Sequence, residues 1–289
     1  MATLVIAFDG LDKELIEEFD LKNIPQQEFG RIDNSTDIKF RNTSELFASF
    51  ITGETFEKHG VKSLKKWSNP RIDSFENKVD GNWFFDKFKG IRQAISESIN
   101  GLSARKTKYR EEDLLCESIF EELEDSRAMF VPSYNPSIFW SIGGGLEPLK
   151  HGYSLEEAAD HWDTREHSYR CQELFEELDN EFVESRSFLM CHFHRSDLFQ
   201  HLYGDKKIGM FDKDKLRKMY EEIDDLALEI KNKAEESGYD RVIFMSDHGL
   251  PEEKQHNKNA FYSCNKELFG SQEPHITDFH DKILGLEAQ

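Results

Sequence analysis

The stretch Arg241-Val242-Ile243-Phe244-Met245-Ser246-Asp247-His248-Gly249-Leu250 decides the fold of this chain. Its first half is a run of apolar, mostly β-branched or aromatic residues, which predicts a strand buried on both faces of a sheet. Asp247 and His248 end the strand, and Gly249 then allows a sharp turn. Open α/β sheets build their sites at such strand ends, so the stretch indicates a candidate site. An oxygen ligand beside a nitrogen ligand suits zinc or manganese, although a cap and a core histidine would explain the pair equally well.

A second strand begins near the N-terminus and ends in the same way. Thr3–Phe8 is another continuous apolar run, and Asp9 and Gly10 follow it directly. Leu11–Phe19 then carries apolar residues at helical spacing. A strand, an Asp-Gly turn and a helix form the opening unit of an α/β protein with a doubly wound sheet. The Asp9 carboxylate could cap this helix or face a metal ion, and capping is the commoner role for an isolated acid.

Composition limits the class of protein and the partners. The 289 residues suit one large α/β domain, and the 57 Asp and Glu against 37 Lys and Arg give a net charge of −20. Such acidity disfavours binding to nucleic acid or to an anionic membrane. The N-terminal apolar run is too short for a secretory signal, no segment is apolar for long enough to span a bilayer, and the four cysteines form no C-x-x-C pair. We therefore expect a soluble cytoplasmic protein with reduced cysteines.

A helix carrying a candidate nucleophile follows the first unit. Apolar residues at helical spacing lead to Gly53, and Asn42 with Glu45 has the form of a capping box. Thr43 would then lie at the positive end of this helix, where backbone N–H groups favour an anion. Its hydroxyl could attack a phosphate if a metal ion lowered its pKa, or it could simply be a second capping group.

The rest of the chain supplies further candidate ligands. Ser187–Phe193 is another predicted strand, and in the segment after it Asp197 and His201 are four residues apart; if that segment is helical, the two side chains share one face and can bind one metal ion. His256 lies in a polar loop before a short predicted strand, Ala260–Ser263. Further helices are predicted at Glu112–Leu123, Ser154–Glu177, Phe211–Ala234 and Thr277–Leu284.

The middle of the chain has a looser pattern. From about residue 62 to 153, basic and aromatic residues mix without a sustained period. We interpret 62–153 as a mixed insertion or cap within a single catalytic domain, 1–289. Its basic residues could face a substrate, although for any one of them a solvated surface position is the commoner explanation.

These motifs, in this order, resemble the type I phosphodiesterase/nucleotide pyrophosphatase branch of the alkaline phosphatase superfamily. The resemblance covers both ends of the chain but not its middle, and it rests on Phe8-Asp9-Gly10, Thr43-Ser44-x-x-Phe47-x-Ser49-Phe50-x-Thr52-Gly53, Lys58-His59-Gly60-Val61, Asp197-x-x-x-His201 and Ser246-Asp247-His248-Gly249. It implies an α/β fold of three α/β/α layers around a mostly parallel, doubly wound sheet.

The resemblance also implies a site with two divalent metal ions, zinc or else manganese. One ion is assigned to Asp197, His201 and His256, with His275 and His280 as competitors for the last place. The other is assigned to Asp9, Asp247 and His248, with Thr43 bridging toward it as the nucleophile.

The implied activity is a metal-dependent phosphoesterase that hydrolyses phosphodiester, nucleotide pyrophosphate or phosphomonoester bonds through a phospho-threonine intermediate. Its substrate would be a small phosphorylated molecule, with nucleotides among the candidates. A catalytically inactive binding module, a sulfatase and a phosphomutase are the alternatives, and Thr43 argues against the last two. The sequence departs from the family where Ser44-Glu45 replaces a common proline. It offers no clear match for the residue that holds the phosphoryl oxygen, for which Lys58, Lys62 and Arg105 are candidates.

Overall fold

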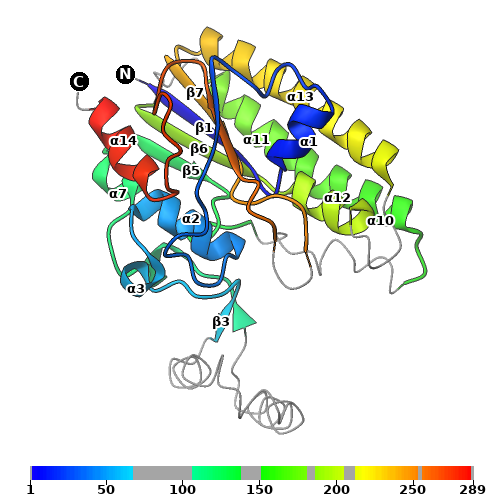
Figure 1. Ribbon diagram of the computed structural model, residues 1–289, viewed down its shortest axis with the longest axis horizontal. Coiled ribbons are helices and arrows are strands. Elements are labelled where there is room, and N and C mark those ends of the chain that lie inside the picture. The colour runs from blue at the N-terminus through cyan, green and yellow to red at the C-terminus, as the bar shows by residue number, and fades with distance from the viewer. Residues whose placement is uncertain are drawn as a thin grey trace, which may run out of the picture.

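A six-stranded sheet forms the centre of the protein (Figure 1). The computed structural model describes residues 2–67, 106–137, 151–180, 186–204, 212–252 and 256–287. The strand order is β2-β8-β7-β1-β6-β5, in which the last four strands are parallel and β8 and β2 are antiparallel to their neighbours. The strands are β1 (Thr3–Phe8), β2 (Glu28–Arg31), β5 (Ser126–Met129), β6 (Phe188–Phe193), β7 (Arg241–Met245) and β8 (Phe261–Cys264).

The three central strands are buried along their whole length, as their apolar runs predict. Their register aligns Ala7 of β1 with His192 of β6 and with Met245 of β7. The polar residues that follow each strand therefore emerge together at the carboxyl edge of the sheet.

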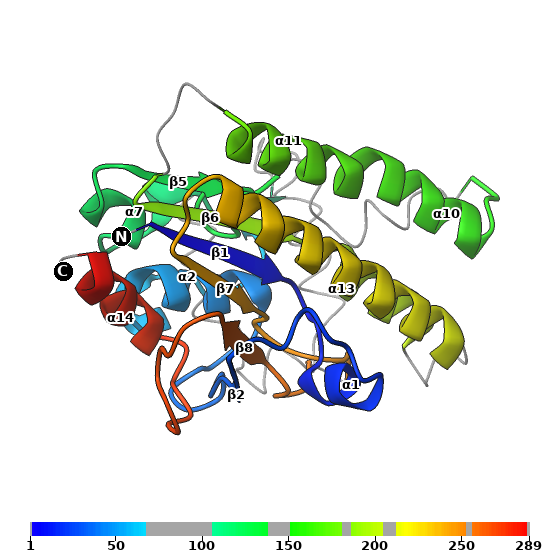
Figure 2. The same cartoon turned by 90° about the horizontal axis from the view of Figure 1, so that it is seen from above.

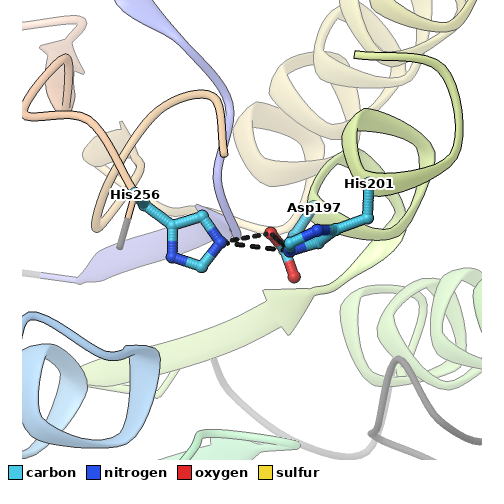
Figure 3. Close-up of side chains that lie close together, drawn as sticks. All are labelled: Asp197, His201 and His256. Carbon is cyan, nitrogen blue, oxygen red and sulfur yellow. Dashed lines mark hydrogen bonds and ion pairs between the residues drawn. The ribbon is translucent and has the colours of Figure 1, made fainter. Parts of the chain in front are cut away.

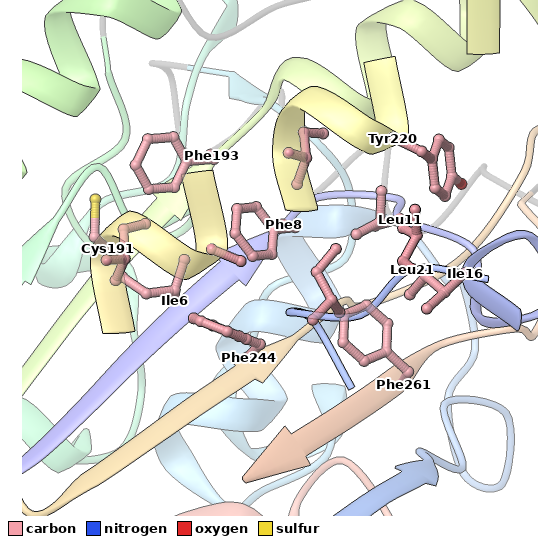
Figure 4. Packing of buried hydrophobic residues seen from close by; sticks show 14 of the residues in the cluster. Ile6, Phe8, Leu11, Ile16, Leu21, Cys191, Phe193, Tyr220, Phe244 and Phe261 are labelled. Atoms are coloured by element: carbon pink, nitrogen blue, oxygen red, sulfur yellow. The ribbon is translucent and has the colours of Figure 1, made fainter. Parts of the chain in front are cut away.

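Helices cover both faces of this sheet (Figure 2). One face carries α1, α11, α12 and α13, and its core contains Phe8, Phe193 and Phe244 (Figure 4). The other face carries α2, α7 and α14, whose apolar residues pack on Val5 and Ala7. Burying a Val or Phe side chain contributes about 1.5–3 kcal/mol, so packing on both faces stabilises the strands. The bounds are α1 (Lys13–Glu18), α2 (Thr43–Thr52), α3 (Phe56–His59), α7 (Ile119–Glu122), α10 (Leu155–Trp162), α11 (Ser168–Leu178), α12 (Arg195–Tyr203), α13 (Lys213–Glu236) and α14 (Asp278–Glu287).

The three-layer α/β/α architecture predicted from the sequence is confirmed. Most predicted elements form, with three differences. The helix predicted at Glu112–Leu123 is wrong: a 3-10 turn at Glu111–Asp113 and the short α7 stand there. The helix predicted at Ser154–Glu177 is divided by a π-helical turn, Asp163–His167, between α10 and α11. The capping box of α2 is half formed, because Glu45 N–H binds Asn42 Oδ1 while the Glu45 carboxylate accepts from the Lys39 and Phe40 N–H groups.

The predicted insertion 62–153 lies largely outside the described residues. Its described part contains a two-stranded ribbon, β3 (Lys66–Trp67) with β4 (Lys106–Thr107), together with α7 and with β5 of the central sheet. The cap stays a prediction. In the part of the chain that the structure describes, no helix combines the length and the apolar character needed to cross a membrane.

Candidate metal centre

All seven candidate site residues meet at the carboxyl edge of the sheet. Asp9 follows β1, the Asp247-His248 pair follows β7, and Asp197 and His201 lie on α12, which begins just after β6. The remaining two residues come from α2, whose first residue is Thr43, and from the loop that contains His256.

Asp197, His201 and His256 form the first group of possible metal ligands (Figure 3). Their ligand atoms lie within 4.8 Å of one another. Asp197 Oδ1 is 3.3 Å from His201 Nε2 and 3.4 Å from His256 Nε2, and the two imidazole nitrogens are 3.1 Å apart. Asp197 and His201 share one face of α12, as their spacing predicts. Two nitrogens and an oxygen converging in this way match the donor set of zinc.

Asp9, Asp247 and His248 form the second group, and all three side chains are fully buried. His248 Nε2 lies 3.3 Å from Asp9 Oδ1 and 3.4 Å from Asp247 Oδ2. His248 Nδ1 is 3.0 Å from the Gly249 carbonyl, which can only accept, so Nδ1 carries a proton and the Nε2 lone pair can point into the group.

The Thr43 hydroxyl lies against this second group. Its Oγ1 is 3.4 Å from Asp9 Oδ1 and 3.2 Å from His248 Nε2. Thr43 is the first residue of α2, whose N-cap is Asn42. The hydroxyl is therefore held at the positive end of a helix and beside two possible ligands of one ion.

The charges of the site fit a bound cation. Three carboxylates, Asp9, Asp197 and Asp247, are buried together. Burial, with Asp9 nearby, raises the pKa of Asp247 well above its usual range. Burial alone would lower the pKa of His248, but Asp247 and Asp9 raise it to about 10. Asp247 Oδ2 accepts no hydrogen bond from any described residue. A buried oxygen with no donor, in a group that favours extra positive charge, is what a divalent ion would satisfy.

Two histidines at the same edge were missed from the sequence. His194 Nδ1 is 2.6 Å and His192 Nε2 is 3.3 Å from Asp9 Oδ2. His194 also forms a third group of possible ligands with Asp9 and Asp197. The sequence did contain a signal, since both histidines stand at the end of a predicted strand. Side chains two residues apart lie on the same face of a strand, so both can reach the end of the neighbouring strand.

Asp12 connects the site to the first helix. Its carboxylate caps α1 by accepting from the N–H groups of Glu14 and Leu15. The same carboxylate accepts from Leu250 N at 3.1 Å and from Asn257 Nδ2 at 2.7 Å. The loop that contains His256 is therefore fastened at both ends to the turn after β1.

The other sequence candidates lie elsewhere. His275 contacts Thr277 and the Thr36 carbonyl, and His280 pairs with Glu122 and Asp281, so neither joins the first group. Among the candidates for holding a phosphoryl oxygen, Lys58 is exposed and paired with Glu54. The Lys62 carbonyl accepts from Asn42 at 3.4 Å, which brings its backbone beside the N-cap of α2, and Arg105 lies outside the described residues.

Comparison with known proteins places the chain in a family. No curated protein matches it. A solved structure of murine ectonucleotide pyrophosphatase/phosphodiesterase 5 covers 86% of this chain and 57% of its own, with 11% identity and a TM-score of 0.46. A second structure of that protein, an inactive threonine-to-alanine variant in complex with AMP, covers the same shares with 10% identity and a TM-score of 0.47. The chain thus spans little more than half the length of these neighbours. Residues 3–269 match the family described as "Type I phosphodiesterase / nucleotide pyrophosphatase". This match covers most of the sequence, so the chain belongs to the type I phosphodiesterase/nucleotide pyrophosphatase family of the alkaline phosphatase superfamily.

Proposed function

We propose that this protein is a metal-dependent hydrolase of phosphoric esters, with Thr43 as its nucleophile. It would cleave phosphodiester or nucleotide pyrophosphate bonds ahead of phosphomonoesters, in a small phosphorylated substrate. One observation carries this proposal: the Thr43 hydroxyl lies 3.4 Å from Asp9 and 3.2 Å from His248, beside the group of possible ligands that Asp9 and His248 form with Asp247. Membership of the family supports the same reaction class.

Two divalent ions, zinc or manganese, would be held by the two groups. Asp197, His201 and His256 would hold one, and Asp9, Asp247 and His248 would hold the other. Such ions neutralise charge on phosphoryl oxygens and favour the ionised form of a nearby hydroxyl.

The residues of the chain then have separate roles. Thr43 Oγ1 loses its proton and forms a bond to phosphorus, while the bond from phosphorus to the alcohol or nucleotide breaks in line with it; the leaving oxygen keeps the bonding electron pair and gains a proton, so no net proton is lost. The N-terminus of α2 favours the negative phosphoryl group at this point. Water then attacks the phospho-threonine, releases the phosphorylated product and restores the hydroxyl. Five of the six ligands follow strand ends or lie on α12, and the loop that contains His256 is fastened to Asp12, so the hydroxyl and the two groups keep their relative positions through both steps.

The test is hydrolysis of bis(p-nitrophenyl) phosphate and of p-nitrophenyl phosphate by the purified protein with Zn²⁺, with Mn²⁺ and with chelator. Thr43→Ala should lower kcat on the order of 10³-fold or more, because it removes the nucleophile. Thr43→Ser, which keeps a hydroxyl, should retain part of the activity.

Thr52→Ala is a matched control. Thr52 is also buried in α2, but it lies in the last turn and donates to the Ala48 carbonyl. This variant should hydrolyse the diester as the wild type does. Full activity in Thr43→Ala would refute the assignment of the nucleophile, and a stable phosphoryl adduct on Thr43 in a rapidly quenched reaction would support it.

A further inference from the structure

A completely buried arginine lies beside the metal centre, and the proposed reaction does not use it. Arg170 of α11 is 0% exposed, and its Nε donates to Glu166 Oε1 at 2.8 Å. Glu166 is also buried, belongs to the π-helical turn before α11, and accepts from Ser137 Oγ at 3.2 Å. The pairing satisfies the charge of Arg170, but only through one side of the guanidinium. The other side points to β6.

Arg170 Nη1 makes two contacts with one residue of β6. It lies 2.9 Å from His192 Nδ1, and it also donates to the His192 carbonyl. The second contact has a topological cause, because the edge strand β5 ends at Met129 opposite Cys191. The guanidinium therefore meets the next β6 carbonyl where strand pairing has stopped.

This geometry fixes the tautomer of His192. A guanidinium has only donors, so His192 Nδ1 must accept with its lone pair and the ring proton must be on Nε2. That Nε2 is 3.3 Å from Asp9 Oδ2 and so donates to it. The ring also packs edge-on against Phe47 of α2, with centroids 4.9 Å apart, which limits its rotation.

The two oxygens of Asp9 are consequently different. His192 Nε2 and His194 Nδ1, at 3.3 and 2.6 Å, both approach Oδ2. Oδ1 instead faces Thr43 and His248 at 3.4 and 3.3 Å. One carboxylate oxygen is thus committed to imidazole donors, and the other faces the site of the proposed ion.

We propose that Arg170 is a positioning residue of the metal centre, which sets the tautomer of His192 and thereby leaves Asp9 Oδ1 as the metal-binding oxygen. This inference rests on the proposed metal-dependent function. Hydrogen-bond partners of metal ligands orient those ligands, and their loss typically costs about 10–100-fold in metal affinity or activity. Here the hydrogen-bond partner of Asp9 is His192, and Arg170 in turn orients His192. Arg170 therefore acts on the metal ligand through one intervening residue.

The test requires a variant that removes the guanidinium without leaving a buried charge unpaired. Glu166→Gln with Arg170→Met replaces the ion pair by neutral groups of similar size, whereas Arg170→Met alone would strand the Glu166 carboxylate. Glu177→Gln with Arg127→Met is the matched control. It likewise replaces one arginine–glutamate ion pair by neutral groups, but Arg127 lies on β5 and is aligned with Leu189, three residues before His192 on β6.

Two readouts separate positioning from a structural role. In protein labelled with ¹⁵N-histidine, the ring nitrogen shifts show which nitrogen of His192 carries the proton, and the signal is assigned by its loss in His192→Gln. Zn²⁺ affinity is measured by competition with a chromophoric chelator. The wild type should show the Nε2–H tautomer. The Glu166→Gln/Arg170→Met double variant should show Nδ1–H as well, and its Zn²⁺ affinity should fall about 10–100-fold. The control variant should match the wild type in both measurements.

Other outcomes would overturn the inference. A wild type with Nδ1–H, or a double variant that binds Zn²⁺ as tightly as the wild type, would refute it while leaving the proposed function intact. A wild type that binds neither Zn²⁺ nor Mn²⁺ would refute the proposed function and the inference together. If the double variant does not fold, Arg170→Lys replaces it. A lysine keeps the charge beside Glu166, but its single nitrogen cannot serve Glu166 and both His192 acceptors, so weaker Zn²⁺ binding is expected, and unchanged binding would refute the inference.

Discussion

Gly10→Ala should disrupt the metal centre far more than it destabilises the fold. Gly10 has φ of +74°, a backbone conformation that costs an L residue roughly 1–2 kcal/mol. A Cβ at this position would lie 3.1 Å from Asp197 Cβ, 3.1 Å from His248 Cε1 and 3.2 Å from Asp197 Cα. These distances are shorter than ordinary carbon contacts of about 3.5–4.0 Å, so both residues must move by several tenths of an ångström. Asp197 belongs to one ligand group and His248 to the other.

Metal–ligand distances keep to within about 0.2 Å of their usual values, which is less than this displacement. We therefore expect a loss of about 1–2 kcal/mol in the free energy of unfolding, measured by urea denaturation of the metal-free protein. We also expect a fall in Zn²⁺ affinity on the order of 10-fold or more, as for other disturbed ligand geometries. Diester hydrolysis at a fixed, limiting Zn²⁺ concentration should fall in parallel.

Gly270→Ala is the control for the free-energy cost of the positive φ alone. Gly270 has φ of +65°, and the nearest atom to an added Cβ is the flexible Glu267 Oε1 at 3.3 Å. The substitution should cost a similar free energy of unfolding and leave Zn²⁺ binding unchanged. If Gly10→Ala and Gly270→Ala bound Zn²⁺ equally well, the close approach of the β1 turn to both ligand groups would not constrain the site, and the reasoning would be refuted.

Three further changes have defined outcomes. Asp12→Ala removes the cap of α1 and the two hydrogen bonds to the loop that contains His256. It should lower the free energy of unfolding in urea by about 1–2 kcal/mol and should also weaken Zn²⁺ binding. A normal Zn²⁺ affinity would show that the loop is held by other contacts. Burial lowers the pKa of His59 to about 4, so between about pH 6.5 and 4 the unfolded chain binds the extra proton and stability falls as the pH falls, by at most about 1.4 kcal/mol per pH unit. In urea denaturation, the free energy of unfolding should fall less between pH 7 and pH 5 in His59→Asn than in the wild type. An equal fall in both proteins would contradict the assignment. Chelation of the metals should lower Tm, since an ion at 100 times its Kd stabilises the fold by about 2.7 kcal/mol, and a Tm unaffected by chelator would argue against bound metals.

The sequence predicted those parts of the site that depend on short-range periodicity. The apolar runs of β1 and β7 identified buried strands, and the polar residues after them then had to share one edge. The four-residue spacing of Asp197 and His201 was sufficient because both lie on one helix. His256 differs, since no spacing connects a loop residue to α12. Its choice rested on the family resemblance.

The features that were missed depend on contacts that helical spacing and capping motifs do not encode. A helix fitted the apolar spacing of Glu112–Leu123, but the segment there forms two short turns separated by an extended backbone at Leu114. The capping box at Asn42 is only half formed, for a local reason. Arg41 has φ of +44°, and the loop before it turns its N–H groups toward the Glu45 carboxylate, a bend that local propensity does not favour.

The contacts of Asp9 show that the register of the strands determines the geometry of the metal centre. His192 reaches Asp9 because Ala7 is aligned with His192 across the β1–β6 pair. A shift of one residue in this register would turn His192 to the opposite face, away from Phe47, and would leave Arg170 facing an apolar neighbour. The buried carboxylate would then lose a donor to Oδ2 and could rotate. The apolar faces of β1 and β6 fix that register by packing against helices on both sides of the sheet. Substitutions in these cores that change strand register should therefore alter metal affinity even where no ligand is touched.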